Sequence, residues 1–508
     1  MALSRREALV FMLIFSLARL HGCVQAKRHF TLKASDYVSA VSKAILHFEG
    51  QRSGQLPKNQ RATWRGNSAL FDGQQEKISL VGGYYDAGDN VKFVWPMSFT
   101  VTLLSWAAIE YQTELIAVGQ MSYLQAAIQW GTDFIIKCHP SPSVLYTQIG
   151  DGDADHKCWE RPEDMDTPRT LYKITPSVPG SEAAAEASAA LSSASLVFKY
   201  VDPGYSKTLL DHAQDLFRFA NSSRGTYTLS CPFYCSFSGY TDEVLWSAAW
   251  LYRATGSAQY LNFVVINQFL SQTVSEFGWD NKYAGLQTLL SKEFYKGTYA
   301  LKLYKDQTET YICSMLPGSP TQQIKTTPGG LIFVRDATNL QYASGAAMLM
   351  LFYVKAMTSN TIQCGSSSFS TSQVRNFARS QVDYILGNNP LGISYMVGYG
   401  NYYPTQIHHR GASIPSITVR PQKVGCGEGF SFMSSSQPNP NVHVGTISGG
   451  PNQYDQYKDS RTDYTHSEPT TYMNAAFVAA ASAFITGGNR ESSHLVLPSA
   501  NETSLWAF

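Results

Sequence analysis

Two segments that lie far apart in the chain each place carboxylates among Tyr and Gly. One is the run YYDAGD, which contains Asp86 and Asp89, and the other spans residues 457–475 and contains Asp459 and Glu468. Hydrolysis of a glycosidic bond needs a protonated carboxyl for the leaving oxygen and an ionised carboxylate for water or for direct attack. A fold that brings these segments together would supply that pair, and aromatic rings nearby would suit the faces of sugars.

Either acidic cluster taken alone also fits a structural role. Asp and Gly are common in turns, so Asp86 and Asp89 could simply cap the backbone there. The interpretation as a catalytic site therefore depends on the combination of segments and on their order along the chain.

Eight segments, in this order, resemble family 9 glycoside hydrolases, and specifically the plant endo-β-1,4-glucanases. The resemblance covers nearly the whole chain after its N-terminal region. The segments are FEGQRSGQLP from Phe48, TWRGNSAL from Thr63, LVGGYYDAGDNVKF from Leu80, DADHKCWERPEDMDTPR from Asp153, FYCSFSGYTDE from Phe233, WDNKYAG from Trp279, SYMVGYGNYYPTQIHHRG from Ser394, and residues 459–475.

The resemblance implies a role for each acidic residue of the two clusters. Asp89 would act as the general base, and Asp86 would hold the same attacking water. Glu468 would protonate the leaving oxygen, which requires a raised pKa. Asp459 is expected to supply the like charge that raises it.

The resemblance also assigns polar contacts with the substrate. His408 and Arg410 match a His-x-Arg pair and are expected to donate to hydroxyls of the sugar beside the cleaved bond. His409, which stands between them, is expected to point elsewhere. His156 is a further candidate for a hydrogen bond to a hydroxyl.

Several aromatic residues lie in or beside the matched segments. Trp159, Trp279 and Tyr472 are predicted to stack on glucose, because a flat apolar ring fits the axial hydrogens of an equatorially substituted sugar. Tyr234 is a further candidate for substrate binding. Trp246 has apolar neighbours at helical spacing and is assigned to the core.

Apolar residues recur at helical spacing through most of the chain, and no convincing run of strands is found. Helices are predicted over residues 34–49, 98–115, 121–138, 181–198, 206–219, 242–254, 258–273, 339–357, 371–386 and 469–484. The resemblance implies an all-α fold, an α/α toroid of six helical hairpins, with long loops that form an open substrate cleft. Residues 388–467 are rich in Gly and Pro, as expected for such loops.

The chain is predicted to have three parts. Residues 1–26 fit a signal peptide, since Arg5 and Arg6 precede an apolar run and Val24-Gln-Ala26 resembles a cleavage site. Residues 27–487 form the catalytic domain and residues 488–508 a short tail. The protein is thus expected to be secreted, to the extracellular space or the cell wall, and free of the membrane after signal removal.

The balance of charged residues excludes some classes of binding partner. Lys and Arg total 39 against 38 for Asp and Glu, so no net field would attract nucleic acid. The expected partner is a β-1,4-glucan polysaccharide, and a monomer is expected.

No cofactor or metal is predicted. Asp151, Asp153 and Asp155 suggest calcium, but the twelve-residue calcium loop needs Gly where this chain has His156. Seven cysteines remain after signal removal, so at least one thiol stays free, and their pairing cannot be deduced.

Together with the export signal, the resemblance implies a secreted endoglucanase that inverts the anomeric carbon. The alternative is a catalytically weak glucan-binding protein of the cell wall on the same scaffold. Such a protein would keep the aromatic residues and lose a carboxylate, whereas all four acids are present here. The preferred glucan stays open among cellulose, mixed-linkage glucan and xyloglucan.

Overall fold

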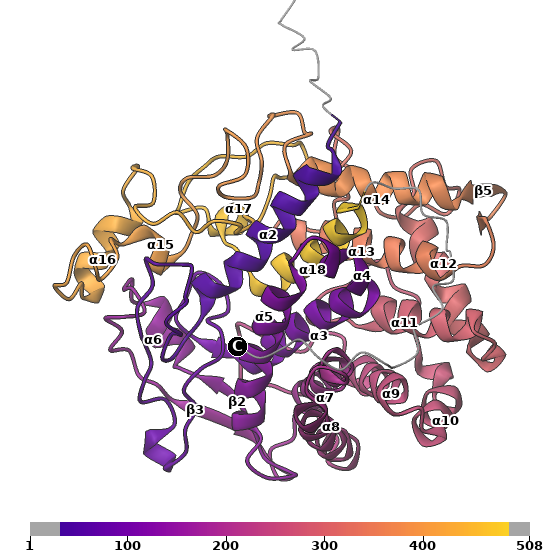
Figure 1. Ribbon diagram of the computed structural model, residues 1–508, viewed down its shortest axis with the longest axis horizontal. Helices are drawn as coiled ribbons and strands as arrows, with labels where there is room; N and C mark the ends of the chain where they lie inside the picture. Colours follow the sequence, from indigo (N-terminus) through magenta and orange to yellow (C-terminus); the bar gives the residue numbers. More distant parts are fainter. Residues whose placement is uncertain (1–30, 487–508) are drawn as a thin grey trace, which may run out of the picture.

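Two concentric rings of helices make up most of the structure. The computed structural model describes residues 31–486, so the predicted signal peptide and C-terminal tail lie outside the described residues. The chain alternates between the rings, one helix outside and the next inside, which gives six hairpins (Figure 1). The predicted α/α barrel is confirmed.

Six helices form the inner ring. Each contacts the next along the chain, and the last contacts the first, so the ring is closed. They are α3 (Val94–Glu110), α7 (Ser181–Phe198), α9 (Thr241–Thr255), α11 (Tyr283–Tyr295), α13 (Leu340–Ala356) and α18 (Thr471–Ala481).

Six helices pack around this ring from outside. They are α2 (Ala34–Gln51), α5 (Met121–Cys138), α8 (Pro203–Ser222), α10 (Ala258–Ile266), α12 (Lys302–Met315) and α14 (Thr371–Ile385). The shorter helices are α4 (Gln112–Ala117), α6 (Gly152–His156), α15 (Arg410–Ser413), α16 (Cys426–Met433), α17 (Tyr464–Ser467), and the 3₁₀ turns η1 (Gln74–Glu76), η2 (Gln268–Leu270), η3 (Tyr299–Leu301) and η4 (Ser482–Phe484).

Inner and outer helices differ in how much of their surface is buried, as α7 and α8 show. Helix α7 is rich in Ala and Ser and almost wholly buried, which allows close approach by its neighbours. Its Ser188 hydroxyl donates to the carbonyl of Ala213 in α8 and accepts from Ser247 in α9, both at 2.7 Å. Outer helix α8 instead buries one stripe, Leu209, Ala213, Leu216 and Ala220, at the spacing of an amphipathic helix.

Two helices that form one hairpin, α11 of the inner ring and α12 of the outer ring, were not predicted. Polar residues occupy buried positions in both helices and interrupt the apolar pattern, and hydrogen bonds satisfy them. Ser291 of α11 and Thr308 of α12 bond to each other at 2.9 Å. The helix predicted over 258–273 ends earlier, at Ile266, where Asn267 and η2 follow.

Short strands, which the sequence did not indicate, accompany the helices. Strands β1 (Lys92–Phe93), β2 (Leu145–Ile149) and β3 (Leu171–Ile174) form an antiparallel sheet in that order, and β4 (Thr361–Cys364) pairs with β5 (Ser367–Ser370). These strands are two to five residues long, too short to show alternation in the sequence.

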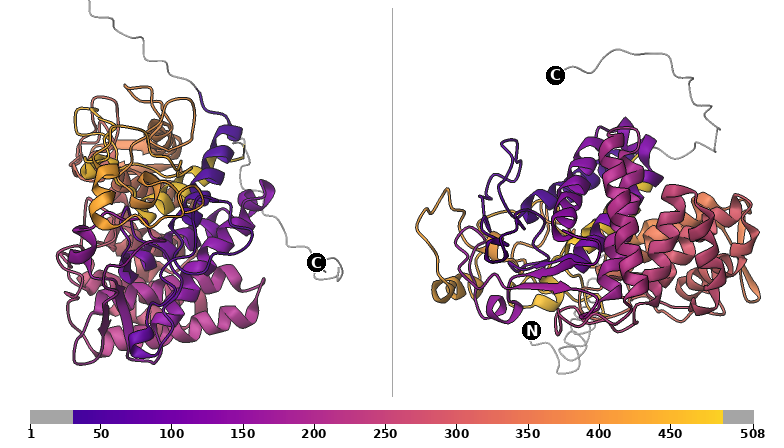
Figure 2. Two further views of the ribbon diagram at one scale, coloured as in Figure 1. Left: turned by 90° about the vertical axis from the view of Figure 1, so that its left-hand side faces the viewer. Right: turned by 90° about the horizontal axis from the view of Figure 1, so that it is seen from below.

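Long connections gather on one side of the helices. Seen from below (Figure 2, right), most helices occupy one side of the molecule, while the sheet and the orange to yellow loops occupy the other. Cys158 and Cys426 are joined across a separation of 268 residues, which ties the loop after α6 to α16. The other disulfides are Cys231–Cys235 and Cys313–Cys364, and Cys138 is a buried free thiol, as the odd count required.

Within residues 31–486, no helix combines the length and the apolar character needed to cross a bilayer.

Candidate active site

The structure brings the two acidic segments together. Asp86 and Asp89 lie in the loop before β1 and α3, Glu468 lies between α17 and α18, and the neighbouring inner helices α3 and α18 pack against each other. The Gly88 N–H donates to Glu468 Oε1 at 3.1 Å, and the Thr471 N–H donates to the carbonyl of Asp86 at 3.2 Å. The loop before one helix is therefore bonded directly to the start of the other.

A third segment, His408 to Arg410, bridges the other two through its backbone. The N–H of His408 donates to the carbonyl of Ser467 at 3.2 Å, and the N–H of Arg410 donates to the carbonyl of Gly88 at 2.9 Å. Each acceptor immediately precedes a carboxylate residue. The bridge thus fixes the backbone next to Glu468 and next to Asp89.

Burial raises the pKa of all three carboxyls, and neighbouring acidic groups add to the shift. The Asp89 pKa rises to about 7, from burial and the Asp155 charge, although His156 and Arg410 oppose the shift. Burial, followed by the charge of Asp89, raises the Asp86 pKa well above its usual range. Burial also raises the pKa of Glu468, which is half-buried.

Asp459 has a different role from the one expected. Its carboxylate accepts hydrogen bonds from the N–H of Thr405 at 2.7 Å, from the Thr405 hydroxyl at 2.8 Å and from the N–H of Gln406 at 2.9 Å. The like charge that acts on Glu468 comes from Asp155 instead. Asp459 therefore holds the loop that leads to His408.

Arg410 is bound within the protein, in contrast to the expected contact with sugar. Its side chain is 3% exposed. Its Nη2 lies 3.0 Å from Asp155 Oδ2 and donates to the carbonyl of Asp155, while its Nε donates to the carbonyl of Cys158. Arg410 thus neutralises Asp155 beside the carboxylates.

His408 faces the site as an acceptor. Its Nδ1 lies 2.7 Å from the carbonyl of Arg461 and must carry a proton to donate there. Burial lowers its pKa to about 4, so the ring is neutral near pH 7 and Nε2 has a lone pair. The expected hydrogen bond to a sugar hydroxyl would run in the opposite direction, with His408 accepting.

The predicted aromatic residues separate into buried and accessible ones. Trp159 is 2% exposed, packs on Ile414 and Val424, and donates from Nε1 to the Ser413 hydroxyl at 2.9 Å. Its ring faces protein, so the expected stacking on glucose does not fit. Trp279 is half-buried and remains suited to stacking.

Tyr234 and Tyr472 lie inside the protein rather than beside solvent. Both are buried, with their hydroxyl oxygens 3.4 Å apart, and the Tyr234 hydroxyl donates to Asp86 Oδ2. The Tyr234 ring meets that of Trp279 edge to face at 4.7 Å. Tyr234 therefore contacts a carboxylate directly, a role that its residue type alone did not reveal.

Accessible groups surround the carboxylates. The His156 side chain is 41% exposed and stacks on Phe233 at 4.4 Å. Phe237, 75% exposed, has its ring centroid 6.5 Å from that of Trp279. The sequence did not point to Phe237, and it suggested Asp155 only as a calcium ligand, although both residues stand inside the matched segments.

One group in the described part of the chain has the spacing of metal ligands. Atoms of Cys158, Glu160 and Cys426 lie within 4.8 Å of one another. The two sulfurs form a disulfide, so neither is a thiolate that could bind a metal.

Sequence and fold both resemble those of known proteins. The profile of Glycosyl hydrolase family 9 matches residues 37–481. The chain belongs to this family. Endoglucanase 18 of Arabidopsis thaliana is 60% identical over 459 residues, which cover 90% of this chain and 96% of that protein.

Solved structures of family 9 members share the fold. The endoglucanase of the termite Nasutitermes takasagoensis superposes with a TM-score of 0.80 at 40% identity, covering 89% of this chain and 98% of that one. The cellulase Cel9M of C. cellulolyticum, in complex with cellobiose, superposes with a TM-score of 0.77 at 30% identity, with the same coverage.

Replacing Asp155 with Asn should lower the pKa of both Asp89 and Glu468. The change removes a negative charge that raises both values and leaves the Arg410 charge unneutralised, which favours the ionised carboxylates further. Asp89 should then titrate below about 7. Carboxyl ¹³C NMR shifts followed against pH would measure this.

The matched control is Asp153→Asn, because Asp153 is an exposed residue of the same helix α6. It should leave both titrations in place. An unaltered Asp89 titration in Asp155→Asn would mean that the Asp155 charge does not contribute to its pKa.

Proposed function

We propose that this protein is a secreted, monomeric endoglucanase that hydrolyses internal β-1,4-glucosidic bonds of cellulose-type glucans by an inverting single displacement. The observation that carries the proposal is the meeting of Asp86, Asp89 and Glu468 at one place in a family 9 barrel. Relatives named endoglucanase, and the cellobiose complex of Cel9M, support the substrate class.

Asp89 would be the general base. A base works best when its pKa lies near the working pH, since it is then both ionised and strongly basic. A pKa of about 7 meets both demands. The N–H of Val91 donates to Asp89 Oδ1 at 2.9 Å, so the other carboxylate oxygen can accept the proton of water.

Asp86 would hold the attacking water beside Asp89. The hydroxyl of Tyr234 occupies its Oδ2, while its Oδ1 is buried and has no hydrogen-bond partner among the described residues. A buried carboxylate oxygen normally has a donor, so Oδ1 is suited to accept one from water.

Glu468 would be the general acid. Its raised pKa keeps the carboxyl protonated to higher pH than an ordinary Glu. The N–H of Gly88 donates to Oε1, which leaves Oε2 as the oxygen that carries the proton. Its partial exposure allows this proton to reach the leaving oxygen of the sugar.

Substrate would bind through accessible aromatic and polar groups along an open cleft. Trp279 and Phe237 offer ring surface for glucose units, and His156 and His408 offer polar atoms for hydroxyls. The net charge of +1 suits a neutral polysaccharide. The weak glucan-binding alternative has no observation in its favour, because both catalytic carboxyls are present.

Endo-action predicts an early loss of viscosity. When internal bonds of a soluble cellulose derivative are cut, chain length falls before many new ends form. Viscosity should therefore fall faster than reducing ends accumulate in the same digest. Release of cellobiose alone from the start would contradict endo-action.

Inversion predicts an α-anomer as the initial product of a β-linked glucan. Water held by Asp86 and Asp89 opposite Glu468 needs carboxyls about 6.5–9.5 Å apart, which leaves room for that water. Proton NMR of fresh digests would record the anomer before mutarotation. An initial β-anomer would refute single displacement.

Substitution of the acid and of the base should have distinct signatures. Glu468→Gln should cost about 10²–10⁴-fold in kcat on natural glucan, the range for general acid–base steps. It should cost much less on a cello-oligosaccharide with a dinitrophenyl leaving group, which departs without protonation. Asp89→Asn should impair both substrates alike, because water must be activated in either case.

Steady-state rates on both substrates measure this difference, provided that bond cleavage limits the rate. Equal losses for Glu468→Gln on the two substrates would show that the roles are assigned wrongly.

A further inference from the structure

We propose that Gln51 and His409 form a positioning pair that holds Asp86 in place for catalysis. The inference rests on the proposed function, in which Asp86 orients the attacking water. Neither residue contacts the reacting atoms. They act through backbone carbonyls on either side of Asp86.

Gln51 is bonded to both neighbours of Asp86. Its side-chain amide donates to the carbonyl of Ala87 at 2.8 Å and to that of Tyr85 at 3.3 Å. Its own backbone carbonyl accepts from the N–H of Tyr85 at 2.9 Å. Since Gln51 is the last residue of α2 and is buried, it links a rigid helix to the loop that carries Asp86.

His409 fixes the orientation of the Gln51 amide. The N–H of Ala412 donates to His409 Nδ1 at 3.0 Å, so that nitrogen has no proton. The proton of the neutral ring is then on Nε2, which donates to Gln51 Oε1 at 2.7 Å. With Oε1 occupied, the NH₂ group of Gln51 must face the two carbonyls.

Aromatic rings pack against the buried ring of His409. Trp64 and His443 pack against it edge to face, with centroids 6.2 Å and 4.9 Å away. Burial, with cationic groups such as Arg65 nearby, holds its pKa well below the usual range. The neutral ring with one fixed tautomer agrees with the bonds to Ala412 and Gln51.

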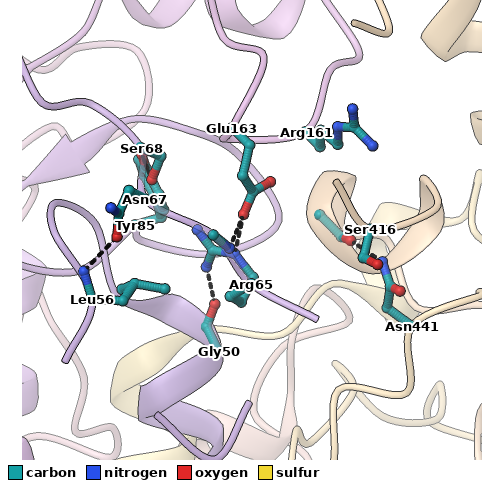
Figure 3. A network of polar contacts seen from close by, with 12 residues as sticks. Gly50, Leu56, Arg65, Asn67, Ser68, Tyr85, Arg161, Glu163, Ser416 and Asn441 are labelled. Atoms are coloured by element: carbon teal, nitrogen blue, oxygen red, sulfur yellow. Dashed lines mark hydrogen bonds and ion pairs between the residues drawn. The ribbon is translucent and has the colours of Figure 1, made fainter. Parts of the chain in front are cut away.

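Both ends of this chain of bonds are anchored (Figure 3). Arg65 donates to the carbonyl of Gly50, next to Gln51, and its Nε lies 2.9 Å from Glu163. The hydroxyl of Tyr85, next to Asp86, donates to Ser68 Oγ at 2.9 Å. Gln51 and His409 are therefore tied to fixed parts of the structure and hold the loop of Asp86 in place.

Repulsion between carboxylates explains why the loop of Asp86 needs these hydrogen bonds. Besides burial itself, the charge of Asp89 raises the pKa of the Asp86 carboxyl, so ionised Asp86 and Asp89 would repel each other. A loop held only at its ends would relax to separate them. Bonds to the carbonyls of Tyr85 and Ala87 resist that movement at the two peptides that flank Asp86.

Variants at position 409 test the pair. His409→Gln places an amide nitrogen where Nε2 stood and keeps the donor to Gln51. His409→Asn keeps an acceptor for Ala412 but cannot reach Gln51. Misplacement of a group by about 1 Å can cost up to about 100-fold in rate. We expect kcat to fall by tenfold or more, toward that limit, in His409→Asn and Gln51→Met, with KM little changed, and His409→Gln to recover much of the loss.

Two further measurements separate positioning from general damage. The loss should be equal on natural glucan and on the dinitrophenyl substrate, because the water-activating side is affected and Glu468 is not. The double variant Gln51→Met/His409→Asn should lose no more than either single variant, since both break one chain of bonds. Gln55→Met, an exposed change on the same segment, is the matched control and should keep full activity.

The proposal is overturned if His409→Gln and His409→Asn lose kcat equally, if the losses multiply in the double variant, or if Gln51→Met keeps the wild-type kcat. Thermal unfolding of each variant checks that it is folded at the assay temperature. Failure of the proposed function itself would appear differently, as a wild-type protein without glucan hydrolysis.

Discussion

Three carboxyl groups share one buried place in this protein, and the repulsion among them is the constraint that the surrounding structure must meet. In addition to burial, the charges of Asp89 and Glu468 raise the pKa of Asp86, and the charge of Glu468 also raises the pKa of Asp89. Such groups stay together only if the backbone beneath them cannot yield. The bridge of His408 and Arg410 to Ser467 and Gly88 supplies this resistance, because it joins the two loops by backbone hydrogen bonds.

The barrel explains why the acids gather at one end, where the inner helices begin. Inner helices alternate with outer ones along the chain, so all six inner helices start at the same end of the barrel. The N-terminus of a helix carries a partial positive charge that favours carboxylates. Glu182, Asp242 and Glu243 lie in the first turns of α7 and α9, and the catalytic loops precede α3 and α18. A closed ring of parallel inner helices thus offers one region that tolerates several acids.

The sequence predicted correctly those features that depend on the types of residue present. Long apolar helices such as α13 were predicted, and the acids in the two matched segments do meet. The failures have a common cause, because they depend on which atoms face each other. Trp159 and Arg410 have the residue types of sugar ligands, but the Cys158–Cys426 loop turns both toward protein. Gln51 stood in a quoted segment, yet only the fold shows which carbonyls it binds.

A second buried cluster of charged residues lies next to Trp279 and is likewise held by a hydrogen bond to the backbone. Lys282 is wholly buried, with Nζ 3.1 Å from Glu243 and 3.7 Å from Glu186, and it donates to the carbonyl of Trp279. A buried ammonium with two carboxylates is stable only when its remaining hydrogens are also bonded, and the Trp279 carbonyl meets that need. The same bond fixes the backbone at Trp279, whose ring is proposed to stack on glucose. The Lys282 ammonium therefore pairs with the buried carboxylates and also holds the backbone at Trp279.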